Sequence, residues 1–175
     1  MDDFKLKPYW KSICQIYFLT KHYLLIAEEL SEDFDTFLQP VKEHRDAFDH
    51  VARVYGIGEL EKQPNNVEKY QIENLKKAIG HTYRAFFDTA DWLSYVCRKE
   101  IRKILSQYSR EQILNQYPNY DSVKNMLIAV PKQIADIRST KDLSDDESLL
   151  IDEVRKYSDI LDQLIEVHSE ICKIF

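Results

Sequence analysis

The chain has 175 residues, of which 44% are hydrophobic and 31% are charged, a composition typical of a folded globular protein and not of a disordered one. Its formal net charge of -6 argues against a protein that coats nucleic acid nonspecifically, because that affinity comes from many lysines and arginines meeting phosphates. The length favours one domain over residues 1–175, and the lack of a run of ~20 apolar residues and of a signal-peptide pattern predicts a cytoplasmic protein with no membrane partner.

Helical periodicity dominates the sequence, and strand signals are nearly absent. We expect a first helix from Pro8 to about Leu30, since proline suits a first helical position. A second helix is expected from Phe34 to Tyr55, with a kink or a new start at Pro40. The glycines of Gly56-Ile57-Gly58 end it.

The middle of the chain predicts one long helix from Val67 to Gln107, because apolar residues recur every three or four positions throughout. The pattern loosens between Tyr108 and Asn119, and a further helix is expected from Tyr120 to Ile137, disturbed at Pro131. The last helix begins after Ser144 and carries an apolar seam that can pack along another helix. The seam consists of Leu150, Val154, Tyr157, Leu161, Leu164, His168, Ile171 and Phe175. The sequence therefore predicts an all-α, up-and-down bundle of four to five long helices.

The second helix carries a short polar string, Glu43-His44-Arg45-Asp46-Ala47-Phe48-Asp49-His50, that is rich in groups able to do chemistry. At about 100° of rotation per residue, one side of this helix is expected to face the core: Val41, His44, Phe48, Val51 and Tyr55. The opposite side is then polar: Asp46, Asp49, His50 and Arg53. Asp46 is one turn before His50 and can orient its imidazole, and Asp49 can pair with Arg53 in the same way.

The pattern Arg45-Asp46-x-x-x-His50 resembles the R-polar-x-x-x-H motif of HEPN (higher eukaryotes and prokaryotes nucleotide-binding) domains. These are small all-helical bundles, many of them metal-independent ribonucleases of bacterial toxin and defence systems. The resemblance implies a HEPN-like fold and a homodimer whose two motif helices face each other across one cleft. It also implies an RNA substrate and, in a toxin system, an antitoxin or another protein partner.

The resemblance also implies roles for the motif residues. Arg45 would stabilise charge on the scissile phosphate, His50 would move protons, and Asp46 would hold His50 in place. The attacking group would be the 2'-hydroxyl of the RNA itself, so DNA would be inert. A histidine titrates near neutrality, which suits general acid–base catalysis at cellular pH.

A second polar stripe, on the long middle helix, is a candidate for the other wall of the cleft that contains His50. Substrate-binding residues are expected there and at the end of the motif helix, where they would hold a phosphate backbone: Arg53, His81, Arg84, Arg98 and Arg102. The alternative for this stripe, as for the polar string itself, is a solvated helix face laced by ion pairs.

No metal or cofactor is predicted. The Glu-x-x-His pattern of di-iron bundles is absent, as are H-E-x-x-H and any cysteine–histidine cluster.

The alternative to the ribonuclease is a noncatalytic helical interaction module or a nucleotide-binding bundle, in which acidic blocks of the chain would contact a basic partner.

Overall fold

The chain folds into helices that run lengthwise through the molecule. A computed structural model describes residues 3–31, 36–60, 62–140 and 147–175. In these residues there are six α-helices and no strand, which confirms the all-α prediction: α1 (Asp3–Leu30), α2 (Leu38–Tyr55), α3 (Val67–Leu105), α4 (Arg110–Gln116), α5 (Tyr120–Thr140) and α6 (Glu147–Ile174). A 3-10 turn, Gly56–Glu59, follows α2.

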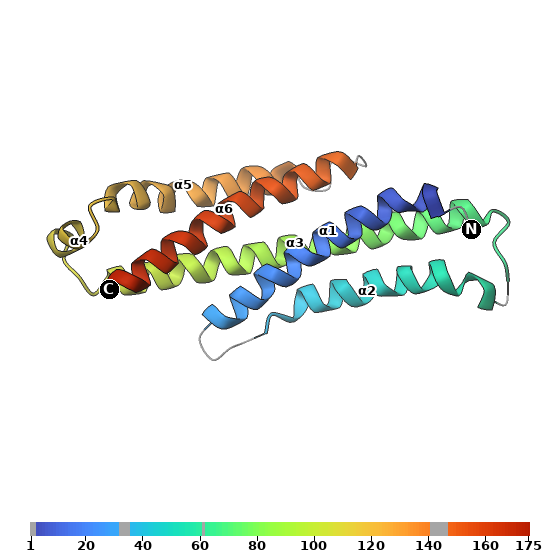
Figure 1. Cartoon of the computed structure of the whole chain (residues 1–175), viewed down its shortest axis with the longest axis horizontal. Helices are drawn as coiled ribbons and strands as arrows, with labels where there is room; N and C mark the ends of the chain where they lie inside the picture. Colours follow the sequence, from blue (N-terminus) through green and yellow to red (C-terminus); the bar gives the residue numbers. More distant parts are fainter. Residues whose placement is uncertain (1–2, 32–35, 61, 141–146) are drawn as a thin grey trace.

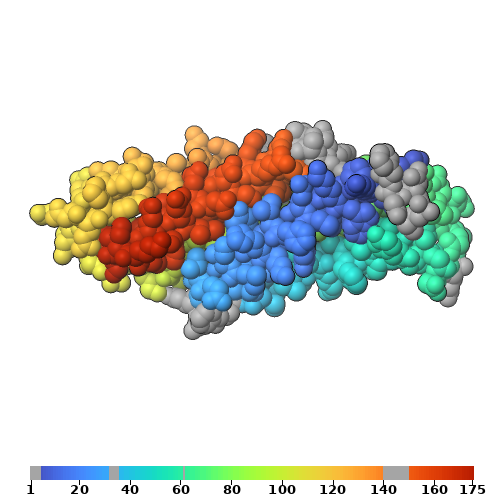
Figure 2. Space-filling model, in the orientation of Figure 1, coloured from blue at the N-terminus to red at the C-terminus, as the bar shows by residue number. Residues whose placement is uncertain are grey.

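The 39-residue helix α3 is the spine of the molecule and is about 58 Å long at 1.5 Å per residue. Both α1 and α2 pack on its N-terminal half, α6 packs on its C-terminal half, and α5 packs on α6 (Figure 1). Successive long helices run in opposite directions, as an up-and-down bundle requires. On the face shown in Figure 2, α1 lies between α6 and α2.

An aromatic cluster fills the place where α1, α3 and α6 meet. The ring of Phe87 lies 4.6 Å from Tyr83 and 5.6 Å from Tyr157, and Phe86 lies 6.3 Å from Tyr23, measured between ring centroids. All five side chains are at most 2% exposed. Tilted and edge-on aromatic pairs at such distances add to the stabilisation that burial alone provides. The cluster therefore ties the two halves of the bundle together.

Tyrosine–carboxylate hydrogen bonds fasten α6 to its neighbours. The hydroxyl of Tyr157 donates to Asp91 Oδ1 at 2.6 Å, and that of Tyr23 donates to Asp162 Oδ1 at 2.9 Å. Burial, and then the hydrogen bond to Asp91, raise the pKa of Tyr157 above its ordinary value. The phenol therefore stays a donor at neutral pH, which matches it to a carboxylate that can only accept.

The expected helix limits are close to the observed ones in the second half of the chain. The long helix is confirmed, and the last helix is confirmed from Glu147 on, while its expected start after Ser144 lies outside the described residues. Most of the predicted seam of α6 is buried: Val154, Tyr157, Leu161, Leu164 and Ile171. Helix α5 continues through the exposed Pro131 to Thr140. Near the N-terminus, α1 begins at Asp3, so Pro8 lies inside it.

Two expectations need correction or fall outside the described residues. The short helix α4 was not expected, although Ser109 and Gln112 form a capping box in which Gln112 N donates to Ser109 Oγ and Ser109 N donates to Gln112 Oε1. That S-x-x-Q pattern is a sequence signal for a helix start. The expected start of the second helix at Phe34 lies outside the described residues, and α2 as described begins at Leu38 with Pro40 in its first turn.

None of the helices in the described part of the chain combines the length and the apolar character that a bilayer span requires.

Replacing Tyr157 by Phe removes the hydroxyl that bonds to Asp91 and leaves the ion pair between Asp91 and Arg138 (3.1 Å) in place. We expect Tyr157→Phe to lower the free energy of unfolding in urea by about 1–2 kcal/mol. The matched control is Tyr95→Phe, because Tyr95 is 59% exposed and its change should stay within about 0.5 kcal/mol. Equal losses in the two variants would contradict a structural role for the Tyr157 hydroxyl.

Candidate site between α2 and α3

Helix α2 is rotated relative to the expected orientation. The predicted core side is wrong for Val41, Phe48 and Tyr55, which are 46%, 69% and 61% exposed. The residues that α2 buries are instead Pro40, Ala47 and Val54. Between these apolar residues, on the side that faces α3, lie Glu43 and His50. Polar contacts with α3 thus flank the apolar residues that α2 buries.

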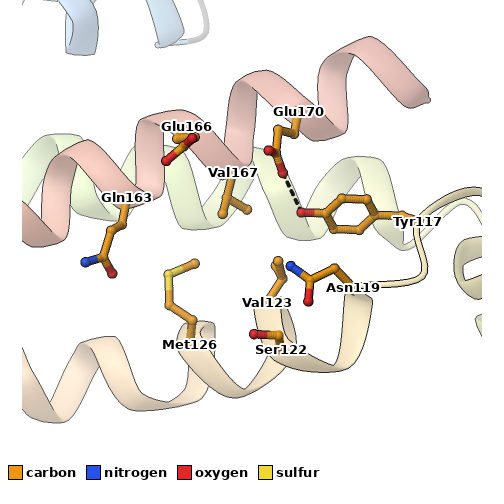
Figure 3. A pocket seen from close by; sticks show the side chains of 9 residues that line it. All are labelled: Tyr117, Asn119, Ser122, Val123, Met126, Gln163, Glu166, Val167 and Glu170. Atoms are coloured by element: carbon orange, nitrogen blue, oxygen red, sulfur yellow. Dashed lines mark hydrogen bonds between the residues drawn. The ribbon is translucent and has the colours of Figure 1, made fainter.

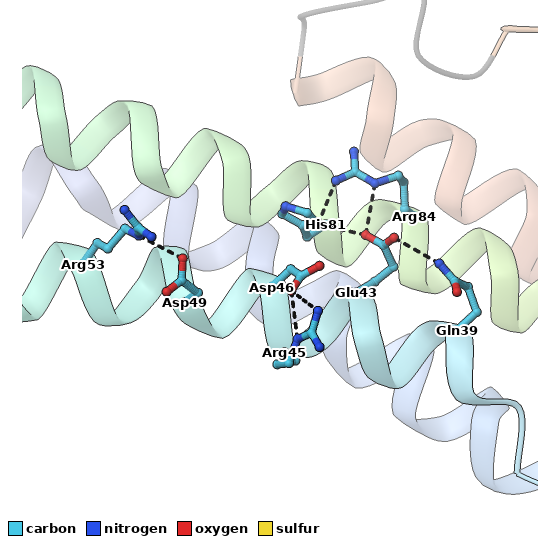
Figure 4. A network of polar contacts seen from close by, with 8 residues as sticks. All are labelled: Gln39, Glu43, Arg45, Asp46, Asp49, Arg53, His81 and Arg84. Atoms are coloured by element: carbon cyan, nitrogen blue, oxygen red, sulfur yellow. Dashed lines mark hydrogen bonds and ion pairs between the residues drawn. The ribbon is translucent and has the colours of Figure 1, made fainter.

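Glu43 is the centre of the contacts between α2 and α3. Its Oε2 accepts from His81 Nδ1 at 2.8 Å and from Arg84 Nε at 3.1 Å, both on α3 (Figure 4). Its other oxygen accepts from Gln39 Nε2 at 3.3 Å. The carboxylate side chain is only 14% exposed. A buried charge is tolerated when it is paired and hydrogen-bonded, and Glu43 meets both conditions.

These contacts decide the protonation of the pair. Burial alone would raise the pKa of Glu43, but the hydrogen bonds from His81 and Arg84 and the charge of Arg84 hold that pKa below its ordinary value. An ionised carboxylate can only accept, so Nδ1 of His81 carries the hydrogen. Arg84 Nη2 lies 2.8 Å from the same Nδ1 and also only donates, so Arg84 is held by Glu43 and not by the imidazole.

His50 points at α3 and not into solvent on the opposite side. Its Nδ1 lies 3.0 Å from Asn74 Oδ1. The amide nitrogen of Asn74 donates to Tyr70 O at 2.9 Å, so Oδ1 is the atom that faces His50 and it must accept. Nδ1 of His50 therefore carries the hydrogen when the ring is neutral, which leaves the lone pair on Nε2. None of the described residues forms a hydrogen bond with that Nε2.

The two imidazoles lie together although they are on different helices. The rings of His50 and His81 are stacked, with centroids 5.4 Å apart and an angle of 25° between their planes. The predicted meeting of His50 with His81 and Arg84 in one place is thus what the structure has. Asp46 was expected to hold His50, but Asn74 makes that contact instead.

Asp46 pairs with its neighbour Arg45. Oδ1 of Asp46 accepts from Nε and Nη2 of Arg45 at 2.9 and 2.7 Å. The hydrogen bond from Arg45 has the largest effect and lowers the pKa of Asp46; desolvation opposes it, and the charges of Arg45, His81 and His50 lower the pKa further. Asp46 therefore lies within electrostatic reach of both imidazoles. We call Glu43, Arg45, Asp46, His50, Asn74, His81 and Arg84 the α2–α3 polar cluster.

The predicted substrate-binding residues divide into two groups. Arg53 lies one turn from His50 on α2 and pairs with Asp49 at 2.8 Å, as expected. Arg98 and Arg102 lie roughly 25 to 32 Å along α3 from His81, at 1.5 Å per residue. The prediction that they share a cleft with His50 is therefore wrong. Residues that recur every three or four positions lie on the same side of a helix, but they can be far apart along its axis.

His44 lies on the other flank of α2, against α1. Its ring centroid is 5.1 Å from that of Tyr17, and its buried Nε2 has no hydrogen-bond partner among the described residues. Burial lowers the pKa of His44, with the nearby charge of Glu43 opposing that effect. His44 is therefore held as a neutral packing group, apart from the polar cluster.

Two residues of the α2–α3 polar cluster, Glu43 and Asn74, were not singled out as site residues from the sequence. Glu43 belongs to the polar string but has no expected partner, since His81 and Arg84 come from a distant part of the chain. Asn74 belongs to no motif; a poor helix former inside a long helix is the single sequence signal for it.

Within the residues that the structure describes, no group of three or more histidine, cysteine, aspartate or glutamate side chains is arranged to hold a metal ion. Comparison of the chain with protein-family models, with curated proteins and with solved structures found no match. The chemistry of the α2–α3 polar cluster must therefore be argued from its geometry. That geometry combines an imidazole whose Nε2 has no partner in the described ranges, a second imidazole and an exposed guanidinium.

The pKa of Glu43 is lower in the folded protein than its ordinary value of 4.5. The contacts of ionised Glu43 therefore stabilise the folded state fully above pH 4.5. This stabilisation is lost as the pH falls through the pKa that Glu43 has in the folded protein. We expect Glu43→Gln to lower the free energy of unfolding by about 1–2 kcal/mol at pH 7. The difference from the parent should shrink as the pH is lowered below 4.5.

The control for this pH series is Glu29→Gln, an exposed carboxylate on α1, which should leave the stability curve unchanged. A difference between Glu43→Gln and the parent that stays constant across the acid range would contradict the assignment of an ionised Glu43 in the folded state.

Proposed function

We propose that the protein is a cytoplasmic, metal-independent endoribonuclease of HEPN type that acts as a homodimer. The observation that carries the proposal is the state of His50: Asn74 holds its Nδ1, and its Nε2, beside a second imidazole (His81), has no hydrogen-bond partner among the described residues. A bacterial toxin or defence system is the setting that the motif Arg45-Asp46-x-x-x-His50 suggests, with an antitoxin or another protein as partner.

The proposed reaction uses groups of the polar cluster. Nε2 of His50 takes the proton from the RNA 2'-hydroxyl, and the resulting oxygen attacks the adjacent phosphorus atom. The bond to the 5'-oxygen breaks, a 2',3'-cyclic phosphate forms, and a protonated imidazole returns a proton to the leaving oxygen. His81, held by Glu43, is available for that second role.

Arg45 is suited to the charge that develops on the phosphate. Its side chain is 73% exposed, so it can turn from Asp46 toward a ligand without disturbing the core. A guanidinium binds phosphate oxygens in a bidentate manner, which a lysine cannot do. In this proposal Asp46 holds Arg45 in place until the substrate arrives.

The homodimer is supported by the outer face of α2. Val41, Phe48 and Tyr55 recur there at intervals of seven residues and are 46–69% exposed. An apolar residue at every seventh position is the pattern of a helix that packs along another helix, and exposed apolar patches mark interaction sites. Contact of two α2 helices along this stripe would place the Arg45 side chains of the two copies beside the interface, while His50 stays on the side of α2 that faces α3.

Purified protein incubated with total RNA in the presence of EDTA should release fragments with 2',3'-cyclic phosphate ends. His50→Ala should slow cleavage by roughly 100-fold or more, because it removes the general base. The control His22→Ala changes an exposed histidine on α1 and should cleave like the parent. RNA with 2'-O-methyl groups should remain intact. Absence of cyclic ends, or cleavage by His50→Ala at the parental rate, would disprove the proposal.

Replacing Phe48 by Lys should convert the dimer into a monomer, since it places a charge in the middle of the apolar stripe. Phe18→Lys is the matched control, because Phe18 is 65% exposed on α1 and lies toward α6, beside Ile151 and Arg155. Sedimentation velocity measures both variants. A parent protein that is monomeric at micromolar concentration, or a dimer that survives Phe48→Lys, would contradict the proposed interface.

The exposed stripe on α2 also fits the alternative, a noncatalytic helical interaction module. In that case a partner protein would copurify in stoichiometric amount, Arg45→Ala would leave the complex intact, and no RNA would be cleaved. The cleavage assay and the sedimentation experiment together separate the two functions.

A further inference from the structure

A cavity of about 290 Å³ lies between the C-terminal end of α3 and the first half of α5. Its floor is apolar: Leu105 and Leu127 are 8% and 7% exposed, and Ile128, at 67% exposure, forms the rim. Tyr120 adds an aromatic side chain to the lining. Small-molecule sites are concave, mostly apolar and provided with a few polar groups, and their volumes begin at about 300 Å³.

The cavity follows from the way α5 packs. The contacts of α5 are chiefly with α6, and it touches α3 little. One side of α5 is buried by this packing through Val123, Leu127 and Val130. The flank that carries Ile128 is therefore left facing the end of α3 across an open space.

The polar groups of this cavity are basic. Arg102 reaches it from α3 and Lys124 from α5, and Ser106 adds a hydroxyl. Neither cation forms an ion pair with a carboxylate of the described residues. Arg98, one turn before Arg102, adds further positive charge on the same helix. In a chain of net charge -6, two cations on opposite walls of an apolar cavity, with no carboxylate partner in the described part of the chain, create a local preference for an anion.

A second cavity, between α5 and α6, has the opposite character. Its volume is about 370 Å³, and its polar lining includes Gln163, Glu166 and Glu170, with the hydroxyl of Tyr117 donating to Glu170 at 2.6 Å (Figure 3). No lysine or arginine lines it. Carboxylates there repel an anion, so this acidic cavity is an internal comparison for the basic one.

We propose that the cavity between α3 and α5 binds an amphiphilic anion, that is, a carboxylate or phosphate monoester with an alkyl or aryl body. The head group lies between Arg102 and Lys124, near the Ser106 hydroxyl, and the body lies on Leu105, Leu127 and Ile128. The cavity is roughly 30 Å along α3 from His81. This binding site is therefore independent of the proposed ribonuclease activity.

Isothermal titration calorimetry of the full chain with decanoate, below its micelle concentration, tests the proposal. Decanoate and decyl phosphate should bind at one site, whereas decanol and decyltrimethylammonium should bind at least about tenfold more weakly, because they lack the charge-assisted hydrogen bonds. The double variant Arg102→Gln/Lys124→Gln should lose binding by a similar factor. Lys132→Gln, an exposed lysine of α5 outside the cavity, should bind like the parent.

Ile128→Asp provides a second variant, because it changes an exposed rim residue and should weaken decanoate binding without unfolding the chain. Equal binding of decanol, full binding by the double variant, or NMR shifts that map to Glu166 and Glu170 would overturn the proposal. Vesicles of phosphatidylglycerol distinguish the source of the anion. Binding to these vesicles without binding of free decanoate would assign the cations to a lipid surface and would also overturn the cavity as the site.

Discussion

The buried carboxylate of Glu43 sets the orientation of α2, and the rest of the candidate site depends on it. Glu43 reaches His81 and Arg84 on α3, and it can do so only if its side of α2 faces that helix. The same rotation turns His50 inward to Asn74 and turns Phe48 outward to solvent. One ion-paired contact thus determines both the place of the imidazoles and the exposure of the apolar stripe.

This arrangement combines rigid and movable groups. His81 and His50 are fixed by bonds to Glu43 and Asn74 and by stacking on each other, so little freedom is lost when a ligand binds. Arg45 is exposed and held by a single neighbouring carboxylate. Catalytic groups need such fixed geometry, whereas a side chain that binds a phosphate can be long and mobile. In the proposed ribonuclease, the fixed imidazoles would transfer protons and the movable Arg45 would bind the phosphate.

The long helices could be predicted from sequence because their signal is local and repeated. Apolar residues at steps of three and four define α3 and the seam of α6 without reference to other parts of the chain. The motif residues Arg45, Asp46 and His50 could also be singled out, because their residue types suggest a chemistry on their own.

The rotation of α2 could not be predicted, because it depends on partners far away in the sequence. The pattern places Val41, Phe48 and Tyr55 inward, and the contacts of Glu43 and His50 with distant residues of α3 reverse that choice. The prediction that Arg102 lies near His50 was wrong for a different reason. Two residues on the same side of α3 can still be far apart along the helix axis.

The tautomer of His50 tests the central claim most directly. Long-range proton–nitrogen NMR at alkaline pH, where imidazoles are neutral, reports which ring nitrogen carries the hydrogen. The bond from His50 Nδ1 to Asn74 Oδ1 predicts a protonated Nδ1 and an unprotonated Nε2, and Asn74→Ala should abolish this preference. A His50 ring with hydrogen on Nε2 in the parent protein would contradict the account.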